Sequence, residues 1–371
     1  MNLKHRIVSL LCAGTLLTGL LSGCGGPGTE FDGTNKSSGN SDTLRLYIWG
    51  EYTGDEIIEN FEEEFGCRVI METFDSNEMM YTKLTSGDSY DVLVPSDYMI
   101  ERLLKENYLQ PIDREVITNF DLLDENVVGL PYDPDNTYSI PYFWGTVGIV
   151  YNKNHVDYAD LEKDGWNILA NPKYENKLYL YDSERDSFMM AFKALGYSMN
   201  TDSEEEIHAA YEWLCNINNT MHPVYVTDEI IDNMINGTKD IGIVYSGDAA
   251  YILSENPDMG YYCPTQGTNI WSDAMVIPKN APNPDLANEF LNYVLTYDAS
   301  YDNTEEVGYT SSNAEVAADV YGEGGIYEGN EAYIPRSGFD KDEVFRDNEY
   351  LRQRLSELWI KVKAGSTASN G

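Results

Sequence analysis

Apolar and polar positions repeat along this chain with two periods, and the two kinds of segment alternate from Thr43 onward. Short apolar-rich runs such as Thr43–Trp49 and Tyr90–Val94 predict strands. In Asp55–Phe65 the apolar residues instead recur every three or four positions, which predicts a helix that ends at Gly66. Strands and helices therefore alternate at βαβ spacing, and we expect a mostly parallel sheet with helices packed on it.

The rest of the chain shows the same alternation. Further strands are predicted at Cys67–Phe74, Thr146–Asn152, Lys177–Tyr181 and Ile241–Tyr245. Further helices are predicted at Asn77–Leu84, Asp97–Glu106, Ser187–Leu195, Glu204–Ile217, Asp228–Ile235 and Asp285–Leu295. A final helix is expected from about Asp342 to Ala364, because apolar residues recur there with a helical period at Phe345, Leu351, Leu355, Leu358 and Val362.

Composition supports a folded body and limits its partners. A length of 371 residues suggests two domains or one large two-lobed body. A hydrophobic share of 42 % is ample for a packed core. The formal net charge of −39 argues against a nucleic acid partner, because phosphate binding needs clustered basic residues. The same charge disfavours adsorption of the folded body to anionic lipid. The expected partners are therefore neutral or cationic.

The N-terminus predicts export. A positively charged start precedes the apolar run Ile7–Leu21, which is too short to span a bilayer comfortably, and Leu-Ser-Gly-Cys follows. This arrangement resembles a bacterial lipobox, so residues 1–23 are expected to be a lipoprotein signal peptide and Cys24 the lipidated residue. An ordinary secretory signal with an incidental cysteine is the alternative. Residues 24–42, rich in Gly, Ser, Asn and Thr, are expected to form a flexible tether.

These features predict an extracytoplasmic protein. It would be lipid-anchored at the outer face of the cell membrane, or periplasmic if the envelope has an outer membrane. Contact with the membrane is expected only through the lipid anchor.

Motifs for catalysis and metal binding are missing. The histidines after the signal segment do not stand at metal-ligand spacing, and the cysteines after Cys24 form no CxxC pair. There is no nucleophile elbow, phosphate loop or dinucleotide fingerprint. We therefore expect no catalytic residue, no cofactor and no metal site. The acids are so numerous that a carboxylate pair for glycoside hydrolysis remains open.

Aromatic and acidic residues recur together where predicted strands end. The four places are Trp49–Tyr52, Pro95–Tyr98, Tyr245–Asp248 and Trp271–Asp273. Ligands of open α/β sheets bind outside the carboxyl ends of the strands. Aromatic rings attract cations and carboxylates supply charge-assisted hydrogen bonds, so an alkyl-ammonium ligand would suit these ends. The chain has 29 Tyr and 63 acids, so chance neighbours are common and the pattern alone also allows a structural role.

Five longer stretches follow one another in a recognisable order, namely Leu44–Tyr52, Tyr90–Tyr98, Tyr138–Asn152, Gly267–Ala281 and Gly308–Asn313. Together they resemble the extracytoplasmic spermidine/putrescine-binding proteins of ABC transporters, collinearly from about Thr43 to Gly365. The resemblance implies a two-lobed α/β fold of the periplasmic-binding-protein type II class. Each lobe would be a mostly parallel sheet flanked by helices, with the ligand cleft between the lobes. It also implies a monomer without enzymatic activity that delivers putrescine or spermidine to the ABC permease subunits.

The resemblance also implies how the chain is divided. Residues 43–145 would form the first part of lobe 1, 146–270 lobe 2, and 271–318 a return to lobe 1. A C-terminal helical segment over 319–366 would pack on lobe 2, and 367–371 would be a tail.

Ligand-binding residues follow from the same resemblance. Asp273 would be the main partner of one ammonium group, Trp271 the wall against the methylene chain, and Asp186 the partner of the opposite end. Asp248 matches an acid of the putrescine-selective branch. The other implied contacts are the aromatic residues Trp49, Tyr52, Tyr98, Tyr245 and Tyr309, the acid Glu51, and the hydroxyl groups of Ser96 and Thr227.

Three positions depart from the family pattern. Ser183 stands where the spermidine-binding branch has an acid, so Glu184 or Asp182 would have to substitute. Tyr245 replaces a usual tryptophan, and the aromatic Phe345 stands near a position that can carry a polar amide. These changes bear on the preference between putrescine and spermidine.

Plainer interpretations remain open. Trp49 and Tyr309 could be core aromatics, Asp273 could cap a turn, and Thr227 could cap the helix that begins near Asp228. For the whole protein, the alternatives are a binding protein of the same architecture for a sugar or an iron complex, and a surface-anchored glycosidase.

Overall fold

The computed structural model describes residues 42–368. The predicted signal peptide over 1–23, the lipidation site Cys24 and the tether up to residue 41 lie outside the described residues. Residues 369–371 of the predicted tail lie outside them as well.

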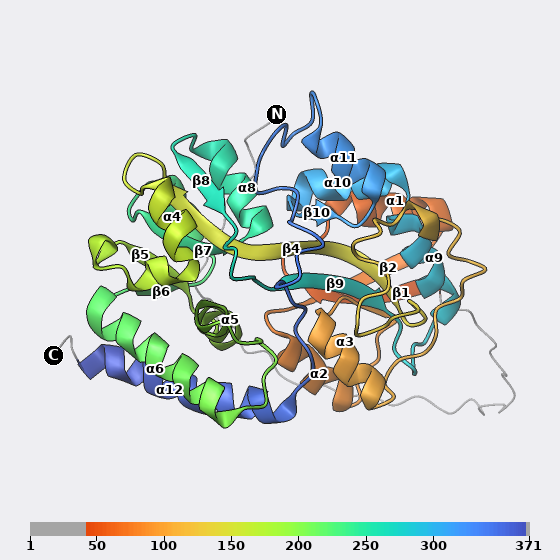
Figure 1. The fold of residues 1–371 in the computed structure, drawn as a ribbon. Helices are drawn as coiled ribbons and strands as arrows, with labels where there is room; N and C mark the ends of the chain where they lie inside the picture. Colours follow the sequence, from red (N-terminus) through yellow and green to blue (C-terminus); the bar gives the residue numbers. More distant parts are fainter. Residues whose placement is uncertain (1–41, 369–371) are drawn as a thin grey trace, which may run out of the picture. The chain divides into compact units, whose positions relative to one another are not determined.

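One long strand connects two sheets. All 14 residues of β4 (Ser139–Asn152) are buried. Its first half pairs with β9 (Ile270–Val276) and β10 (Thr310–Ser311), and its second half pairs with β7 (Ile241–Tyr245) and β8 (Met259–Tyr262). Figure 1 shows β4 passing from one group of strands to the other. We call the part around the first half lobe 1 and the part around the second half lobe 2.

Parallel strands complete each lobe. In lobe 1, β1 (Thr43–Trp49) lies between β2 (Arg68–Phe74) and β3 (Val92–Leu93), parallel to both. In lobe 2, β5 (Leu178–Tyr181) lies parallel to β7 on one side and to β6 (Val224–Val226) on the other. Across both lobes, the strands of the described residues follow the continuous order β2-β1-β3-β9-β4-β7-β5-β6. The strands β8 and β10 lie off this path and also pair with β4.

The sheets are mixed, which corrects the expectation of mostly parallel sheets. β9 is antiparallel to β3 and β4, and β4 is also antiparallel to β7 and β8. The physical reason is the route of the chain, which leaves lobe 1 along β4 and returns along β9. Two neighbouring strands that carry the chain out and back must run in opposite directions.

Helices flank both sheets (Figure 1). In chain order they are α1 (Asp55–Phe65), α2 (Asn77–Thr85), α3 (Asp97–Lys105), α4 (Tyr158–Asp164), α5 (Glu184–Leu195), α6 (Glu204–Met221), α7 (Glu229–Ile235), α8 (Ser246–Glu255), α9 (Pro284–Val294), α10 (Tyr297–Val307), α11 (Ala314–Tyr321) and α12 (Glu349–Ala368). Short 3₁₀ helices lie at Phe120–Leu122, Gly165–Ala170 and Pro172–Tyr174. The elements α6 and α12 lie side by side, and both pack against α5 in lobe 2 (Figure 1).

Most predicted bounds hold within a few residues, and those of α1 and β7 are unchanged. Two elements are exceptions: β4 begins at Ser139 rather than at Thr146, and the final helix begins at Glu349 rather than at Asp342. The Asp342 carboxylate accepts two hydrogen bonds from the Arg336 guanidinium and one from the Thr268 backbone N–H. Further along, the Arg346 side chain and the Asp347 backbone N–H both bond the Glu101 carboxylate of α3 in lobe 1. These contacts keep the segment before Glu349 out of a helix, so α12 starts only after it.

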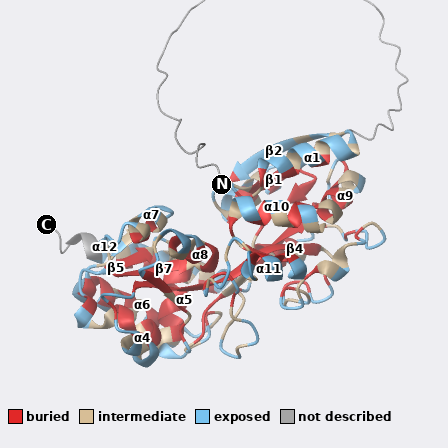
Figure 2. Cartoon of the chain, turned by 90° about the horizontal axis from the view of Figure 1, so that it is seen from above, coloured by how far each residue is buried: buried red, intermediate tan, exposed pale blue. Residues whose placement is uncertain are grey.

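The predicted apolar face of α12 is buried. Leu351, Leu355, Leu358 and Val362 are at most 6 % exposed. Removing each such side chain from water contributes roughly 1.5–3 kcal/mol. The Asn218 side chain of α6 also donates a hydrogen bond to the Val362 carbonyl at 2.9 Å. Figure 2 shows the buried residues following the strands and the inner faces of the helices in both lobes.

Candidate ligand-binding site

A buried carboxylate lies on β9, where this strand meets the start of α3. Asp273 is 7 % exposed and forms an antiparallel bridge with Ser96, whose side chain also hydrogen-bonds the carboxylate. The Tyr52 hydroxyl donates to Asp273 Oδ2 at 2.9 Å. Burial raises the pKa of Asp273 to about 6, although the bonds from Ser96 and Tyr52 oppose the shift. A carboxylate has about four acceptor positions, so Asp273 can still accept a further donor.

Aromatic rings from both lobes surround the second residue of β9. Trp271 shares a strand face with Asp273, because side chains alternate along a strand. Its ring lies 5.3 Å from that of Tyr309 in lobe 1 and 6.0 Å from that of Tyr245 in lobe 2, edge to face in both cases. The Tyr52 and Tyr309 rings are 5.8 Å apart. The four rings therefore form one connected wall that spans the two lobes.

A second buried carboxylate comes from lobe 2. Asp186 lies in the first turn of α5, where its backbone N–H donates to the capping hydroxyl of Ser183. The hydroxyl of Tyr245, at the end of β7, donates to Asp186 Oδ2 at 2.9 Å. Burial raises the pKa of Asp186 above its usual range, against the bonds from Ser183 and Tyr245. This pair repeats the tyrosine–carboxylate arrangement of lobe 1.

A third carboxylate links the lobes directly. Asp248 lies in the first turn of α8 in lobe 2, and the Tyr309 hydroxyl of lobe 1 donates to its Oδ1 at 2.9 Å. Burial raises the pKa of Asp248 to about 7. We call the three pairs Tyr52–Asp273, Tyr245–Asp186 and Tyr309–Asp248 the tyrosine–carboxylate network.

Two glycines allow this close approach. A Cβ atom at Gly247 would stand 1.7 Å from Cδ1 of Tyr309, so the ring lies directly on the glycine backbone. A Cβ atom at Gly145 would stand 2.6 Å from Cζ2 of Trp271. Any larger residue at either position would require the neighbouring ring to move.

Three other predicted residues have different partners. The Trp49 ring lies 4.6 Å from the Phe74 ring. It packs against two hydrophobic clusters, one that contains Phe74 and one that contains Tyr52. Glu51 is exposed and has a left-handed backbone with φ of 52°. The exposed Thr227 donates its hydroxyl to Glu229 Oε2 at 2.8 Å. Their contact with a ligand stays a prediction.

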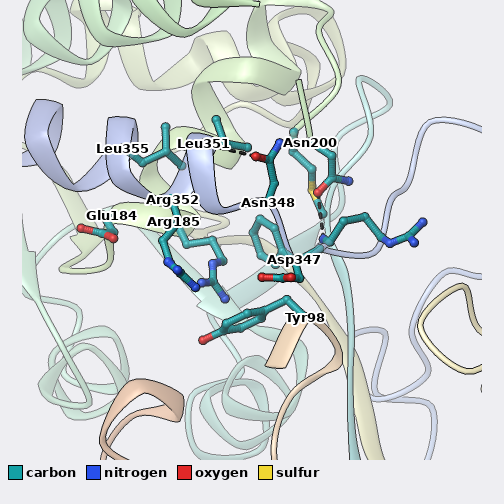
Figure 3. A pocket seen from close by; sticks show the side chains of 12 residues that line it. Tyr98, Glu184, Arg185, Asn200, Asp347, Asn348, Leu351, Arg352 and Leu355 are labelled. Carbon is teal, nitrogen blue, oxygen red and sulfur yellow. Dashed lines mark hydrogen bonds between the residues drawn. The ribbon is translucent and has the colours of Figure 1, made fainter. Parts of the chain in front are cut away.

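The last two predicted residues lie beside a cavity between the lobes. Tyr98 is 8 % exposed, accepts a hydrogen bond from Asn77 and donates one to Glu78. Glu184 lines the same cavity, and burial raises its pKa against a hydrogen bond from Ser356. Figure 3 shows both Tyr98 and Glu184 at this cavity.

Tyr181 belongs to the site and was missed from the sequence. It closes β5, its ring lies 5.2 Å from that of Tyr245, and its hydroxyl donates to Asp228 at 2.9 Å. The signal was available, because Tyr181 ends a predicted strand as the other aromatic candidates do.

Two charged residues were also missed, although each stands between predicted site residues. Asp97 follows Ser96 and is 1 % exposed; burial raises its pKa to about 8. Arg185 precedes Asp186 and lies over the Tyr98 ring. The sequence does not distinguish such inward-facing charges from the many exposed ones.

The network is suited to an extended cationic ligand. Its carboxylates can accept hydrogen bonds from ammonium groups, and its ring faces can pack against methylene groups. In residues 42–368 no group of three or more His, Cys, Asp or Glu side chains is placed to hold a metal ion. Over the same residues no helix combines the length and apolar character that crossing a membrane requires.

Comparison with known proteins gives consistent similarities. The family model of bacterial extracellular solute-binding proteins matches residues 56–324. The chain is 34 % identical over 328 residues to the spermidine/putrescine-binding periplasmic protein of Salmonella typhimurium. This alignment covers 88 % of this chain and 93 % of the Salmonella protein.

Two solved structures are similar over nearly their whole length. The spermidine/putrescine ABC transporter substrate-binding protein PotD of Streptococcus pneumoniae has a TM-score of 0.76 and 34 % identity, covering 88 % of this chain and 100 % of that chain. The Tp0655 lipoprotein of Treponema pallidum has a TM-score of 0.73 and 25 % identity, covering 86 % and 99 %.

These findings confirm the resemblance and the two-lobed periplasmic-binding-protein fold that it implied. They also place the protein outside the cytoplasm. The chain belongs to the family of bacterial extracellular solute-binding proteins.

Proposed function

We propose that this protein is the substrate-binding lipoprotein of an ABC importer, which captures putrescine or spermidine and delivers it to the permease subunits. The observation that carries the proposal is the tyrosine–carboxylate network, whose acids come from both lobes and enclose a wall of aromatic rings. The Salmonella relative is a spermidine/putrescine-binding protein by name, which supports the same class of ligand.

The network would hold the two ends of a polyamine separately. Asp273 would accept hydrogen bonds from one ammonium group, and Asp186 from the opposite one. Trp271 and Tyr309 would pack against the methylene chain between them and attract the charged ends through their ring faces. Burial raises the pKa values of Tyr52, Tyr245 and Tyr309, so these hydroxyls stay protonated. Each hydroxyl therefore remains a hydrogen-bond donor that orients the carboxylate beside it.

Ligand capture would be coupled to the position of the lobes. The acids lie on elements of both lobes, and β4 and β9 carry the chain between them. A ligand that bonds Asp273 and Asp186 at once stabilises only an arrangement in which both acids are near it. Binding would therefore shift the population of lobe arrangements toward the closed one.

The remaining parts of the proposal concern the whole protein. Cys24 would carry the lipid anchor and residues 24–42 the tether; the Treponema neighbour is itself described as a lipoprotein, which supports this. The body would act as a monomer without enzymatic activity, divided into lobes at residues 145, 270 and 318.

Titration calorimetry with putrescine and spermidine tests the proposal. We expect saturable binding of at least one of them, and no binding of glucose or of a ferric-citrate complex under the same conditions. The absence of heat and of a thermal shift with both polyamines at millimolar concentration would contradict the proposed function.

A further inference from the structure

The aromatic residues at one end of the site already hold a cation. The Arg185 guanidinium carbon lies 3.2 Å from the centre of the Tyr98 ring and 5.2 Å from that of Phe345. Its terminal nitrogen is 3.8 Å from Glu78 Oε1, and its side chain is 23 % exposed. Two rings and a carboxylate surround this charge, which is the same chemistry that would bind a ligand ammonium group.

The cation reaches across from the other lobe. Arg185 lies in the first turn of α5 in lobe 2, directly before Asp186, whereas Tyr98 belongs to α3 in lobe 1. Figure 3 shows Arg185 and Tyr98 together at the cavity between the lobes. A positive charge at a helix N-terminus is electrostatically unfavourable, so the rings and Glu78 must compensate for it.

Little free space remains at this end. The cavity lined by Tyr98, Glu184, Arg185 and Phe345 has a volume of about 30 Å³. That volume holds one or two water molecules, so any ligand arm that reached this end would lie directly against Arg185. An ammonium group that entered here would also meet a fixed positive charge in a partly buried setting, where repulsion is poorly screened.

We propose that Arg185 closes the Tyr98 end of the site and thereby makes the protein select diamines over triamines. The inference rests on the proposed function and narrows it to the shorter ligand. It also gives Tyr98 a different role from the predicted one, as the platform of Arg185 rather than a wall of the ligand. The ligand would then be confined to the tyrosine–carboxylate network.

Calorimetry with putrescine, spermidine and N-propylputrescine tests the inference. We expect the wild type to bind putrescine at least tenfold more tightly than spermidine. In Arg185→Gln this ratio should fall at least fivefold, because the repelling charge is gone. Arg185→Lys keeps the charge but loses the planar stacking on Tyr98, so its ratio should lie between those of the wild type and Arg185→Gln.

The matched control is Arg102→Gln. Arg102 also stacks on a tyrosine, at 3.6 Å from the Tyr81 ring, and pairs with a glutamate, Glu106, but both of these partners belong to lobe 1, as Arg102 itself does. Its substitution removes the same charge and the same kind of contact, so the putrescine-to-spermidine ratio should stay that of the wild type.

N-propylputrescine tests the wild type directly, so the inference does not depend on whether Arg185→Gln folds. It extends putrescine by a propyl group but lacks the third ammonium group, and should bind at least tenfold more tightly than spermidine. Equal or weaker binding would overturn the inference.

The other outcomes are also distinct. An unchanged ratio in Arg185→Gln, or a wild type that binds spermidine as tightly as putrescine, would overturn the role of Arg185 while leaving the proposed function intact. If the wild type binds neither polyamine, the proposed function fails and the inference fails with it.

Discussion

Asp186, Asp248 and Asp273 are each placed where most water has been removed, and each is bonded to one tyrosine hydroxyl. Burial raises the pKa of all three, which means that ionising any of them without a nearby cation is unfavourable. A bound ammonium group would relieve that cost. The neutral tyrosine hydroxyls do not fully offset the cost of ionising these acids, so a cationic ligand would add stabilisation.

The first prediction concerns the acid of lobe 1. Asp273→Asn keeps an acceptor for the Tyr52 hydroxyl but removes the charge that would face an ammonium group. We expect polyamine affinity to fall by about 2–4 kcal/mol, roughly 30- to 1,000-fold. Titration calorimetry measures the change, and Asp258→Asn, at an exposed position, is the matched control. Wild-type affinity in Asp273→Asn would remove this residue from the site.

The second prediction follows from the raised pKa values. Burial raises the pKa of Asp273 to about 6 and that of Asp248 to about 7, so both are largely protonated at pH 5. Binding an ammonium group requires the ionised form, so affinity should rise at least about tenfold from pH 5 to pH 8. Calorimetry at pH 6 in buffers of different ionisation enthalpy should show proton release on binding. A flat affinity over this range would contradict the assignment.

Not all of the site could be predicted from the sequence. The resemblance named all three acids and the Trp271–Tyr309 wall, and the structure brings them together. Which tyrosine bonds which acid was not predictable, because the partners Tyr52 and Asp273 are 221 positions apart in the chain. The inward direction of Arg185 was hidden for the same reason, since it depends on a ring in the other lobe.

Three helices begin at the site, namely α3, α5 and α8, with Asp97, Asp186 and Asp248 in their first turns. A helix N-terminus carries a partial positive charge, which by itself would disfavour a cationic ligand. Asp186 and Asp248 oppose this partial charge when they are ionised, whereas Asp97, with a pKa of about 8, is mostly protonated at neutral pH. The same backbone ends could thus serve anions in other proteins, and the acids adapt them to a cation.

The third prediction concerns the helix α8 and its contact with lobe 1. In Gly247→Ala the added methyl group would overlap the Tyr309 ring, whose Cδ1 lies 1.7 Å from the position of that Cβ. The lobes could not approach as closely, and we expect polyamine affinity to fall about tenfold or more, or about 1.4 kcal/mol. Gly365→Ala, which meets no atom within 4 Å, is the control for calorimetry. An unchanged affinity would show that this contact does not accompany binding.

Elements were predictable where the apolar pattern was strong. The period in Asp55–Phe65 defined α1 fully, because its buried face is set by its own residues. The helix α10 (Tyr297–Val307) was missed, since it is mostly polar and its stability depends on packing against α9 and α11. The start of α12 was misplaced because Asp342 bonds a distant arginine, a contact that no local pattern reveals.

For the whole molecule, the net charge of −39 hides two populations of acids. Most are solvated, whereas the few in the network make the folded state itself sensitive to pH. Their folded pKa values lie above the value of about 3.9 in an unfolded chain. The native state therefore binds more protons than the unfolded state between about pH 4 and 7, and the contribution of these groups to stability falls as pH rises through that window.

The fourth prediction tests this cost in the unliganded protein. Asp248→Asn can still accept the Tyr309 hydrogen bond but carries no charge. We expect its melting temperature to exceed that of the wild type by about 2–5 °C at pH 8 and to match it near pH 4.5, where Asp248 is neutral. Scanning fluorimetry at both pH values measures the difference, with Asp258→Asn as the control. Equal melting temperatures at pH 8 would contradict a buried charge at this position.

The antiparallel pairing of β4 with β9 sets the order in which the strands of lobe 1 can pair. Lobe 2 lies between these strands in the chain, so its own strands β5 to β8 are all made before β9. The N-terminal strands β1 to β3 are synthesised first but find their neighbour β9 only after Val276 has emerged. The earliest part of the described chain therefore keeps one sheet edge unpaired until a late segment, which also carries Trp271 and Asp273, has been made. Tyr309 and β10 follow still later in the chain, so the ligand site and the sheet of lobe 1 are completed only after β9 is in place.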